Sequence, residues 1–353
     1  MVLPAHLIQR NHIPSSVTVG TIPRYVFRVY NPKSAGETST TRVASPAPEC
    51  SREDIFVTLR RHPQEAFRRL LDHLNGYDDS HEEFCNFMSW TSSLLFALLY
   101  GIYQAEFTNN RYDDTKILIL DTQYIKPGSF IKDIDILRLF DDSGAPRGFG
   151  SIHNFLKLRR EYYFGEYLSQ SEVDVLGHCA EASFWDLMNH GLEELYPWLF
   201  DASLEGKWAK REKDAREKYH KDDTLVTLDD AEKVIKIAEN SFGGSWTTPM
   251  AAMILGLERR SPNDPNIASA FRNRGTLLGS LDVNISSTDM NGNNLPELES
   301  AGNVIAAIRV GDVSHQPVEE LDELAHLDLD LASLALSDAS HQDDTQDEKY
   351  VES

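Results

Sequence analysis

The stretch FCNFMSWTSSLLFALLYGIYQAEF, residues Phe84–Phe107, decides the fold of this chain. Before its last two residues it carries no Asp, Glu, Lys or Arg, although a quarter of the whole chain is charged. Its first part, Phe87–Ser93, is rich in aromatic and hydroxyl side chains and predicts a short strand that leads into a turn. The apolar run Leu94–Tyr103 predicts a buried helix, with Ser92 or Ser93 as its N-cap. A strand that delivers hydroxyl groups to a helix N-terminus is suited to carry a polar site on a rigid base.

The same stretch has two other interpretations. One is a core strand and a core helix whose serines only cap, because apolar runs most often serve packing. The other is a membrane span. Its purely apolar part, however, is about half of the roughly 20 residues that a bilayer requires. Polar side chains also interrupt the run, among them Asn86, Ser89 and Gln104. We therefore predict no membrane-spanning segment here.

The composition limits the partners that this chain can have. It has 353 residues and a formal net charge of -22 at pH 7, which is long enough for one large domain or two smaller ones. The segment 311–353 alone holds 13 acidic residues against one lysine. Nucleic acid and anionic membranes both require basic surface, so an acidic body predicts that neither is a partner.

The cysteines and the first residues indicate a reducing compartment. Cys50, Cys85 and Cys179 are far apart and odd in number, so they offer neither a disulfide framework nor a paired metal-ligand spacing. Residues 1–20 contain no uninterrupted apolar core and predict a loose leader without a secretory signal. We therefore expect an intracellular protein, in the cytoplasm or the nucleus.

Two further strands and a helix surround the opening stretch. Pro23–Tyr30 is β-branched and aromatic with alternating character, and Lys116–Asp121 predicts a central strand. Glu53–Asn75 has apolar residues at helical spacing, with Pro63 as a predicted break. Two brief strand candidates follow near residues 165–176.

Residues 181–262 predict a helical extension, and residues 263–353 predict a mostly disordered, polar and acidic tail. The extension holds helical patterns over 184–200, 204–221, 228–240 and 250–259. Within the tail, leucines interleave with acids over Leu321–Leu336. That pattern is typical of a solvated acidic tail, and the alternative is a segment that folds on a partner protein. No metal-binding motif occurs, and the twelve histidines are interpreted as surface or packing residues.

Three polar features fall in a suggestive order along the chain. Arg28 lies on the first predicted strand, Ser89 lies in the hydroxyl-rich strand, and Glu166 begins a short late strand. Such a set suits cleavage of the nicotinamide–ribose bond of NAD, whose transition state is an oxocarbenium-like cation. A carboxylate balances the developing charge, an arginine holds the pyrophosphate, and a serine orients the site. Each residue also has a purely structural interpretation, and it is their joint order that favours an enzyme.

Two resemblances follow from these residues. The segment Val26-Phe27-Arg28-Val29 resembles the arginine strand of the cholera-toxin-like class of ADP-ribosyltransferases, and Phe87–Leu94 is similar to that class's aromatic-x-Ser-Thr-Ser strand. Glu166–Val173 is similar to the strand that begins with the catalytic glutamate. The chain also resembles a domain family of filamentous fungi in which a Tyr-Phe-Arg start, a Trp-Thr-Ser-Ser helix start and a Glu-Tyr-Leu segment recur. The fungal family brings no activity with it. Together the resemblances cover about residues 21–180.

The resemblance to the transferases implies roles for individual residues. Arg28, Trp90 and Thr91 would bind NAD, Ser89 would orient the site, and Glu166 would be catalytic. Trp90 and Thr91 replace the central and last residues of the Ser-Thr-Ser motif. Arginine-modifying relatives carry a second glutamate two residues before the catalytic one, where this chain has Phe164, which argues against arginine as the acceptor. Glu172, in a Gln-x-Glu pattern, is the alternative catalytic residue.

The sequence therefore predicts an α+β fold with an ADP-ribosyltransferase-like split β-sheet core over residues 21–180. Flanking helices, the helical extension and the acidic tail complete it. The expected function is transfer of ADP-ribose to a protein acceptor, or hydrolysis of NAD, without a metal. The alternative is a catalytically inactive domain of the same fold that acts as a protein-binding or recognition module.

Overall fold

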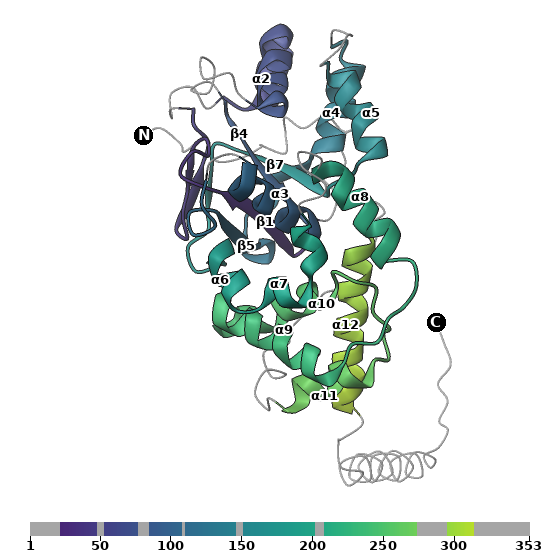
Figure 1. Ribbon diagram of the computed structural model, residues 1–353. Coiled ribbons are helices and arrows are strands. Elements are labelled where there is room, and N and C mark those ends of the chain that lie inside the picture. The colour runs from purple at the N-terminus through teal and green to yellow at the C-terminus, as the bar shows by residue number, and fades with distance from the viewer. Residues whose placement is uncertain are drawn as a thin grey trace, which may run out of the picture.

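The computed structural model describes residues 22–47, 53–76, 85–107, 110–145, 151–201, 208–273 and 295–313 (Figure 1). The leader predicted over residues 1–20 and the leucine-rich acidic segment 321–336 lie outside these residues. The described part is a mixed α/β fold built on an antiparallel sheet. In Figure 1 the helices α2, α4 and α5 lie at the top of the sheet, and the helices from α6 to α12 gather below and beside it.

A six-stranded sheet forms the centre of the fold. Its spatial order is β6-β7-β4-β1-β5-β9, and every neighbouring pair is antiparallel. The predicted strands at residues 23–30, 87–93 and 116–121 are confirmed, because each is rich in the β-branched or aromatic residues that fit a pleated, half-buried surface. The six strands are β1 (Tyr25–Tyr30), β4 (Phe87–Thr91), β5 (Lys116–Asp121), β6 (Phe130–Lys132), β7 (Glu166–Gln170) and β9 (Cys179–Ser183).

The sheet has a weak joint in its middle. β1 pairs with β5 along its whole length, from Tyr25 to Tyr30, but its register with β4 is the single pair Phe27 and Thr91. The joint therefore divides the sheet into two halves of three strands each, β6-β7-β4 and β1-β5-β9. Backbone groups on either side of the joint are left for side chains to satisfy.

A second, three-stranded sheet covers one face of the first. It has the order β2-β3-β8, and its strands are β2 (Glu37–Thr38), β3 (Arg42–Ala44) and β8 (Glu172–Asp174). An apolar layer lies between the two sheets, and Met88, Trp90, Phe130, Val43 and Val173 belong to it. This layer fixes which residues of β4 point away from the helices.

Helices cover the other face of the six-stranded sheet. Over the β6-β7-β4 half lie α1 (Ile55–Arg61), α2 (Pro63–Asn75), α4 (Asp133–Asp142) and α5 (Ile152–Glu161), which share one apolar cluster. Pro63 separates α1 from α2, as the sequence predicts, because proline lacks the N–H that a continuing helix needs. Over the β1-β5-β9 half lies α3 (Leu94–Phe107).

Helix α3 begins where the sequence predicts. The Ser93 hydroxyl accepts a hydrogen bond from the Phe96 N–H at 3.0 Å, so Ser93 is the N-cap. Most of the helix is buried, and it packs so closely on α6 that Gly101 leaves no space for a side chain: a Cβ there would lie 1.9 Å from the Phe184 ring. The apolar run thus forms a core helix that anchors both the sheet and the helical extension.

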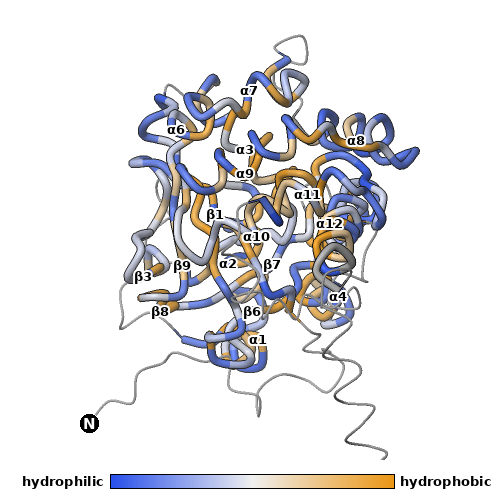
Figure 2. Tube along the Cα trace, turned by 90° about the horizontal axis from the view of Figure 1, so that it is seen from below, coloured by the Kyte–Doolittle hydropathy of each residue, from blue (hydrophilic) through white to orange (hydrophobic). Residues whose placement is uncertain are grey.

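The helical extension shares its core with the sheet. Its helices are α6 (Phe184–Asn189), α7 (Leu192–Leu195), α8 (Trp208–Tyr219), α9 (Leu228–Ser241), α10 (Thr247–Leu255), α11 (Pro265–Asn273) and α12 (Pro296–Val313). One continuous apolar cluster joins β1, α3 and β5 to α9, α10, α11 and α12. In Figure 2 hydrophobic segments gather in the interior near β1, α10 and α12, and α8 lies at the edge of the view.

Three expectations about this region differ from the structure. The helix expected over 184–200 is interrupted at Gly191, which has a φ of 106°, and at Pro197, which opens a short 3-10 turn. The domain boundary expected at 180 falls inside β9, which pairs with β5. The tail expected from 263 onward contains α11 and α12, whose apolar faces are buried against α9 and α10. Among the described residues, no helix is both long enough and apolar enough to cross a bilayer.

Candidate active site

A cleft of about 570 Å³ opens over the joint between β1 and β4, on the helical face of the sheet. This volume is within the ~300–1,000 Å³ that ligand pockets typically have. Residues of β1 and its following loop, α2, β4, α3, α5 and the start of β7 line it. The cleft therefore lies where helices of the two sheet halves face each other across a gap in strand pairing.

The alternation of β4 brings two hydroxyl groups to the cleft side. Met88 and Trp90 point into the apolar layer between the two sheets, so Ser89 and Thr91 point to the helical face. Ser89 is exposed in an otherwise buried strand. Its hydroxyl and the Nε2 of His73, near the end of α2, lie 2.8 Å apart.

Arg28 lies at the joint itself. Its guanidinium Nη1 donates to the Ser89 carbonyl oxygen at 2.9 Å, and its Nε donates to Thr38 Oγ1 at 2.9 Å. The guanidinium also lies 6.0 Å from the centre of the Trp90 ring. Arg28 is 9 % exposed and lines the cleft, so it is a fixed cation that ties β1 to β4 where their backbones pair least.

Glu166 begins β7, directly opposite Thr91 of β4. It is therefore a diagonal neighbour of Ser89 across the two strands, a relation that places Cα atoms about 7–8 Å apart. Its carboxylate pairs with the Arg159 guanidinium of α5 at 2.6 Å, and Arg159 also bonds the buried Asp133 at the start of α4. One arginine thus lies between two carboxyl groups.

The environment shifts the acidity of Glu166. Burial raises its pKa to about 7, the Arg159 cation opposes this shift, and the neighbouring Asp133 adds to it. Desolvation penalises the charged form of a carboxyl group, and a second carboxylate nearby does the same. Glu166 therefore changes protonation near neutral pH, which is unusual for a glutamate and typical of functional sites.

A stripe of side chains along α3 forms another wall of the cleft, beside β1 and β4. Phe96, Tyr100 and Gln104 recur every four residues, are half-buried in a helix that is otherwise mostly buried, and all line the cleft. The rings of Phe96 and Tyr100 stack at 5.8 Å, and Phe96 stacks on Phe164 at 4.9 Å. This stripe offers flat apolar surface beside the polar groups of β4.

The structure brings five of the six predicted site residues to this cleft. They are Arg28, Ser89, Trp90, Thr91 and Glu166. The Trp90 side chain, however, is 2 % exposed; its ring packs on Phe130 at 5.4 Å and its Nε1 donates to Ser169. It is therefore a core residue.

Glu172 lies elsewhere. It is on β8 in the three-stranded sheet, with Arg42 at 3.8 Å, and does not line the cleft. Glu166 and Glu172 lie on different sheets because Ser171, with a φ of 62°, turns the chain between them.

Three residues of the site were not identified from the sequence: His73, Arg159 and Asp133. His73 is one of the twelve histidines that the sequence analysis interprets as surface or packing residues, and in the structure its Nδ1 lies 3.3 Å from the Cys85 sulfur. Arg159 and Asp133 are single charges in short helices, a common pattern on a solvated surface. The stripe of Phe96, Tyr100 and Gln104 was not identified either, although its i, i+4 recurrence is a local signal of one helix face.

The ring of His73 is held neutral. Burial lowers its pKa to about 3, and the Arg28 cation adds to the effect. We expect the imidazole signals of His73, assigned by their loss in His73→Gln, to show no titration in the neutral pH range. Replacing Arg28 with Met should raise this pKa but leave it below the ordinary value of 6.5, because burial is the larger cause. A ring that titrates at an ordinary value in the unmodified chain would contradict this assignment.

The charge of the cleft is opposite to that of the chain. Its lining holds the cations Arg28, Lys33 and Arg159 against one carboxyl group, that of Glu166, whereas the whole chain carries a formal net charge of -22. A cationic cleft in an acidic protein favours an anionic ligand over a cationic one. Within the described ranges, no group of three or more His, Cys, Asp or Glu side chains is placed to hold a metal ion.

These features define a class: an α+β domain in which a divided antiparallel sheet presents a serine, an arginine and a half-buried glutamate to one cationic cleft. Residues 21–178 match a family model described as Domain of unknown function (DUF7587). The matched range holds the strands from β1 to β8 and every residue of the cleft, and it ends before β9 and the helical extension. Comparisons with curated proteins and with solved structures found no match.

Proposed function

We propose that this chain binds NAD in the cleft and cleaves its nicotinamide–ribose bond, passing ADP-ribose to water or to a protein acceptor. The observation that carries the proposal is that Arg28, Ser89 and Glu166, which lie far apart in the sequence, line one cleft. The resemblance to ADP-ribosyltransferases implies this gathering, and it also implies a divided sheet. The single residue pair between β1 and β4 agrees with that implication.

Each residue has a chemical role in the proposal. The Arg28 cation binds the pyrophosphate, and the stripe of Phe96 and Tyr100 stacks on a flat ring. Ser89 hydrogen-bonds the ribose beside the scissile bond. As the bond between the ribose C1′ and the nicotinamide nitrogen breaks, its electron pair leaves with nicotinamide. The carboxylate of Glu166 stabilises the cation left on the ribose. An acceptor oxygen or nitrogen then attacks C1′ and loses a proton.

The acidity of Glu166 gives the proposal a pH signature. The carboxylate stabilises the ribosyl cation only when it is ionised, and its pKa is raised to about 7. We therefore expect kcat/KM for NAD cleavage to rise with pH, with a midpoint near 7, and to level off above it. The measurement is nicotinamide release over a pH series at constant ionic strength. A rate that stays constant from acidic to neutral pH would remove Glu166 from this role.

A second function has one observation in its favour. Arg159 forms an ion pair with Glu166. This pair offsets the negative charge of the carboxylate, which the enzyme would need to stabilise a ribosyl cation. An inactive domain that only binds a dinucleotide, and acts as a recognition module, is consistent with that pair.

One experiment separates the two functions. Purified chain is titrated with NAD in a calorimeter and is then incubated with NAD while free nicotinamide is measured by chromatography. Binding with release supports the enzyme. Binding without release supports the recognition module. Absence of NAD binding overturns both the enzyme and the module that binds a dinucleotide.

A further inference from the structure

We infer that Arg216 and Glu297 of the helical extension are positioning residues for Glu166, so the extension completes a site whose cleft residues all come from the matched range 21–178. This inference rests on the proposed function. It adds to the proposed function two residues that contact neither the substrate nor the cleft and act only through Glu166. Arg216 is on α8 and Glu297 is on α12, some fifty and one hundred and thirty residues after Glu166.

The segment before Glu166 is held at three successive carbonyl groups. Arg216 Nη1 donates to the Tyr163 carbonyl oxygen at 2.7 Å. The Thr91 hydroxyl donates to the Phe164 carbonyl at 2.5 Å, and the Ser92 backbone N–H donates to the Gly165 carbonyl at 2.9 Å. The three donors come from α8, β4 and the turn before α3. The backbone that enters β7 is therefore fixed from both sides.

Arg216 is itself fixed by Glu297. Its Nε and Nη2 bond the two carboxylate oxygens of Glu297 at 3.0 and 2.6 Å, which is a bidentate pair. The Glu297 side chain is 3 % exposed and also accepts a hydrogen bond from the Ser93 hydroxyl, the N-cap of α3. Although burial acts to raise it, the Arg216 cation holds the pKa of Glu297 below its ordinary value. The pair is thus charged, buried and directional.

The start of α12 also packs against the same segment. Gly165 has a φ of 65°, and a Cβ on it would lie 2.4 Å from Ser92 Oγ and 2.8 Å from Leu295 Cδ1. Leu295 immediately precedes α12 and is buried. Two contacts from the extension, one ionic and one apolar, therefore meet the residues just before Glu166. The family match ends at 178, whereas part of the support for this glutamate comes from later residues.

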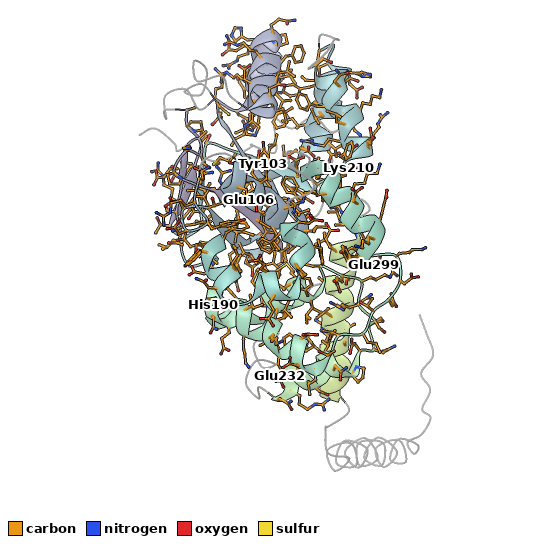
Figure 3. All side chains as sticks on the ribbon, viewed as in Figure 1. Tyr103, Glu106, His190, Lys210, Glu232 and Glu299 are labelled. Carbon is orange, nitrogen blue, oxygen red and sulfur yellow. The ribbon has the colours of Figure 1, made fainter. Side chains whose placement is uncertain are left out.

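The outer faces of the same helices provide matched controls. Figure 3 labels Lys210 on α8 and Glu299 on α12, and both side chains project from the surface of the molecule. Lys210 pairs with Asp214 at 3.1 Å and Glu299 pairs with Arg259 at 3.5 Å, so neither ion pair involves the segment 163–165. Changes at these positions alter the same helices and the same kinds of charge without touching the support of Glu166.

The test uses the full chain and the double variant Arg216→Met with Glu297→Gln. The double variant removes both members of the buried Arg216–Glu297 pair, because loss of one partner alone is the usual cause of unfolding. Glu212 on α8 also pairs with Arg216 and is buried, and burial raises its pKa well above the ordinary value, so in the variant this carboxyl group is uncharged when it holds its proton. Thermal unfolding monitors the fold. The single variant Glu297→Gln, which keeps the size of the side chain, takes its place if the double variant is unstable. The control is Lys210→Met with Glu299→Gln.

We expect kcat for NAD cleavage to fall by at least ~10-fold in the double variant, since misplacement by about 1 Å can cost ~100-fold. KM should change little, because the cleft walls remain. The pH at which the rate of NAD cleavage reaches half its maximum should differ from the value of about 7 that is expected for the unmodified chain. The controls should change none of these. A folded double variant with unchanged kcat and an unchanged midpoint would overturn the inference.

A readout that does not depend on turnover separates this inference from the proposed function. The carboxyl carbon of Glu166 is followed by NMR in chain labelled at glutamate, with Glu166→Gln for assignment. A titration midpoint that differs between unmodified chain and double variant supports the positioning role, even if no nicotinamide is released. An identical midpoint in both overturns it. Absence of NAD cleavage in the unmodified chain overturns only the proposed function.

Discussion

Replacing Glu166 with Gln is expected to reduce nicotinamide release from NAD by roughly 10²–10³-fold, the loss typical when one electrostatic stabiliser of a transition state is removed. Gln keeps the shape and hydrogen-bonding reach of the side chain but carries no charge, so NAD affinity should change little. Glu172→Gln is the matched control, because Glu172 lies on the three-stranded sheet outside the cleft. Equal rates in the unmodified chain and the Glu166 variant would exclude the role of this residue.

The same substitution has an expected effect on stability. Burial raises the pKa of Glu166 above its ordinary value, so the folded protein holds this proton more tightly than the unfolded chain does. Folded stability therefore falls as pH rises from the ordinary value of 4.5 towards about 7, and it changes no further through this group above that. Gln does not ionise, so the loss of stability over this pH range should be smaller in the variant.

Replacing Arg159 with Met is expected to destabilise the fold by about 3–5 kcal/mol, the range found when one partner of a buried charge pair is removed. Arg159 is 11 % exposed and lies between Asp133 and Glu166, so its loss leaves two carboxyl groups buried together without a cation. Chemical denaturation at neutral pH measures the effect. Arg160→Met is the control, because Arg160 is the exposed neighbour on the same helix. If the free energy of unfolding falls no further in the Arg159 variant than in the control, the ion pairs of Arg159 contribute little to stability.

The Arg159 variant should also respond to pH in a defined direction. Without the cation that opposes the shift, the pKa of Glu166 should rise further above about 7. The destabilisation should therefore be largest at pH values above the raised pKa. It should shrink as pH falls below the ordinary value of 4.5, where the carboxyl group is protonated in both the folded and the unfolded chain. A destabilisation that is constant across this range would point to lost packing of the long side chain instead.

The positions of the central elements followed from local pattern. The strand at Lys116–Asp121, the helix start at Ser93 and the break at Pro63 were all predicted within the described residues. Each depends on a property that neighbouring residues express together: alternation, a capping hydroxyl, or a missing N–H. The same patterns place Arg28, Ser89 and Glu166 on strands. The expectation that they meet came from the resemblance to ADP-ribosyltransferases, which left Glu172 as the alternative to Glu166.

The helices of the extension were harder to delimit. Residues 263–353 are predicted as a mostly disordered, polar and acidic tail, yet α12 packs on α10 and α11 and its apolar residues up to Ile308 are mostly buried. Its apolar residues are distributed around the helix, so no single stripe indicates a core-facing side. The partners that cover this helix come from segments far away in the sequence, and a window of neighbouring residues contains no information about them.

The sequence by itself determined the central strands β1, β4 and β5, the start of α3 and the break at Pro63, because alternation, caps and prolines act over a few residues. Their order along the chain and the resemblance to ADP-ribosyltransferases suggested Arg28, Ser89 and Glu166 as the candidate site, with Glu172 as the alternative to Glu166. Only the tertiary structure decided that β1 and β4 pair at Phe27 and Thr91 alone, that His73 contacts Ser89, and that Arg159 and Arg216 support Glu166. The acidity of a carboxyl group depends on which charges and how much water surround it in the fold, and these are set by contacts between distant segments.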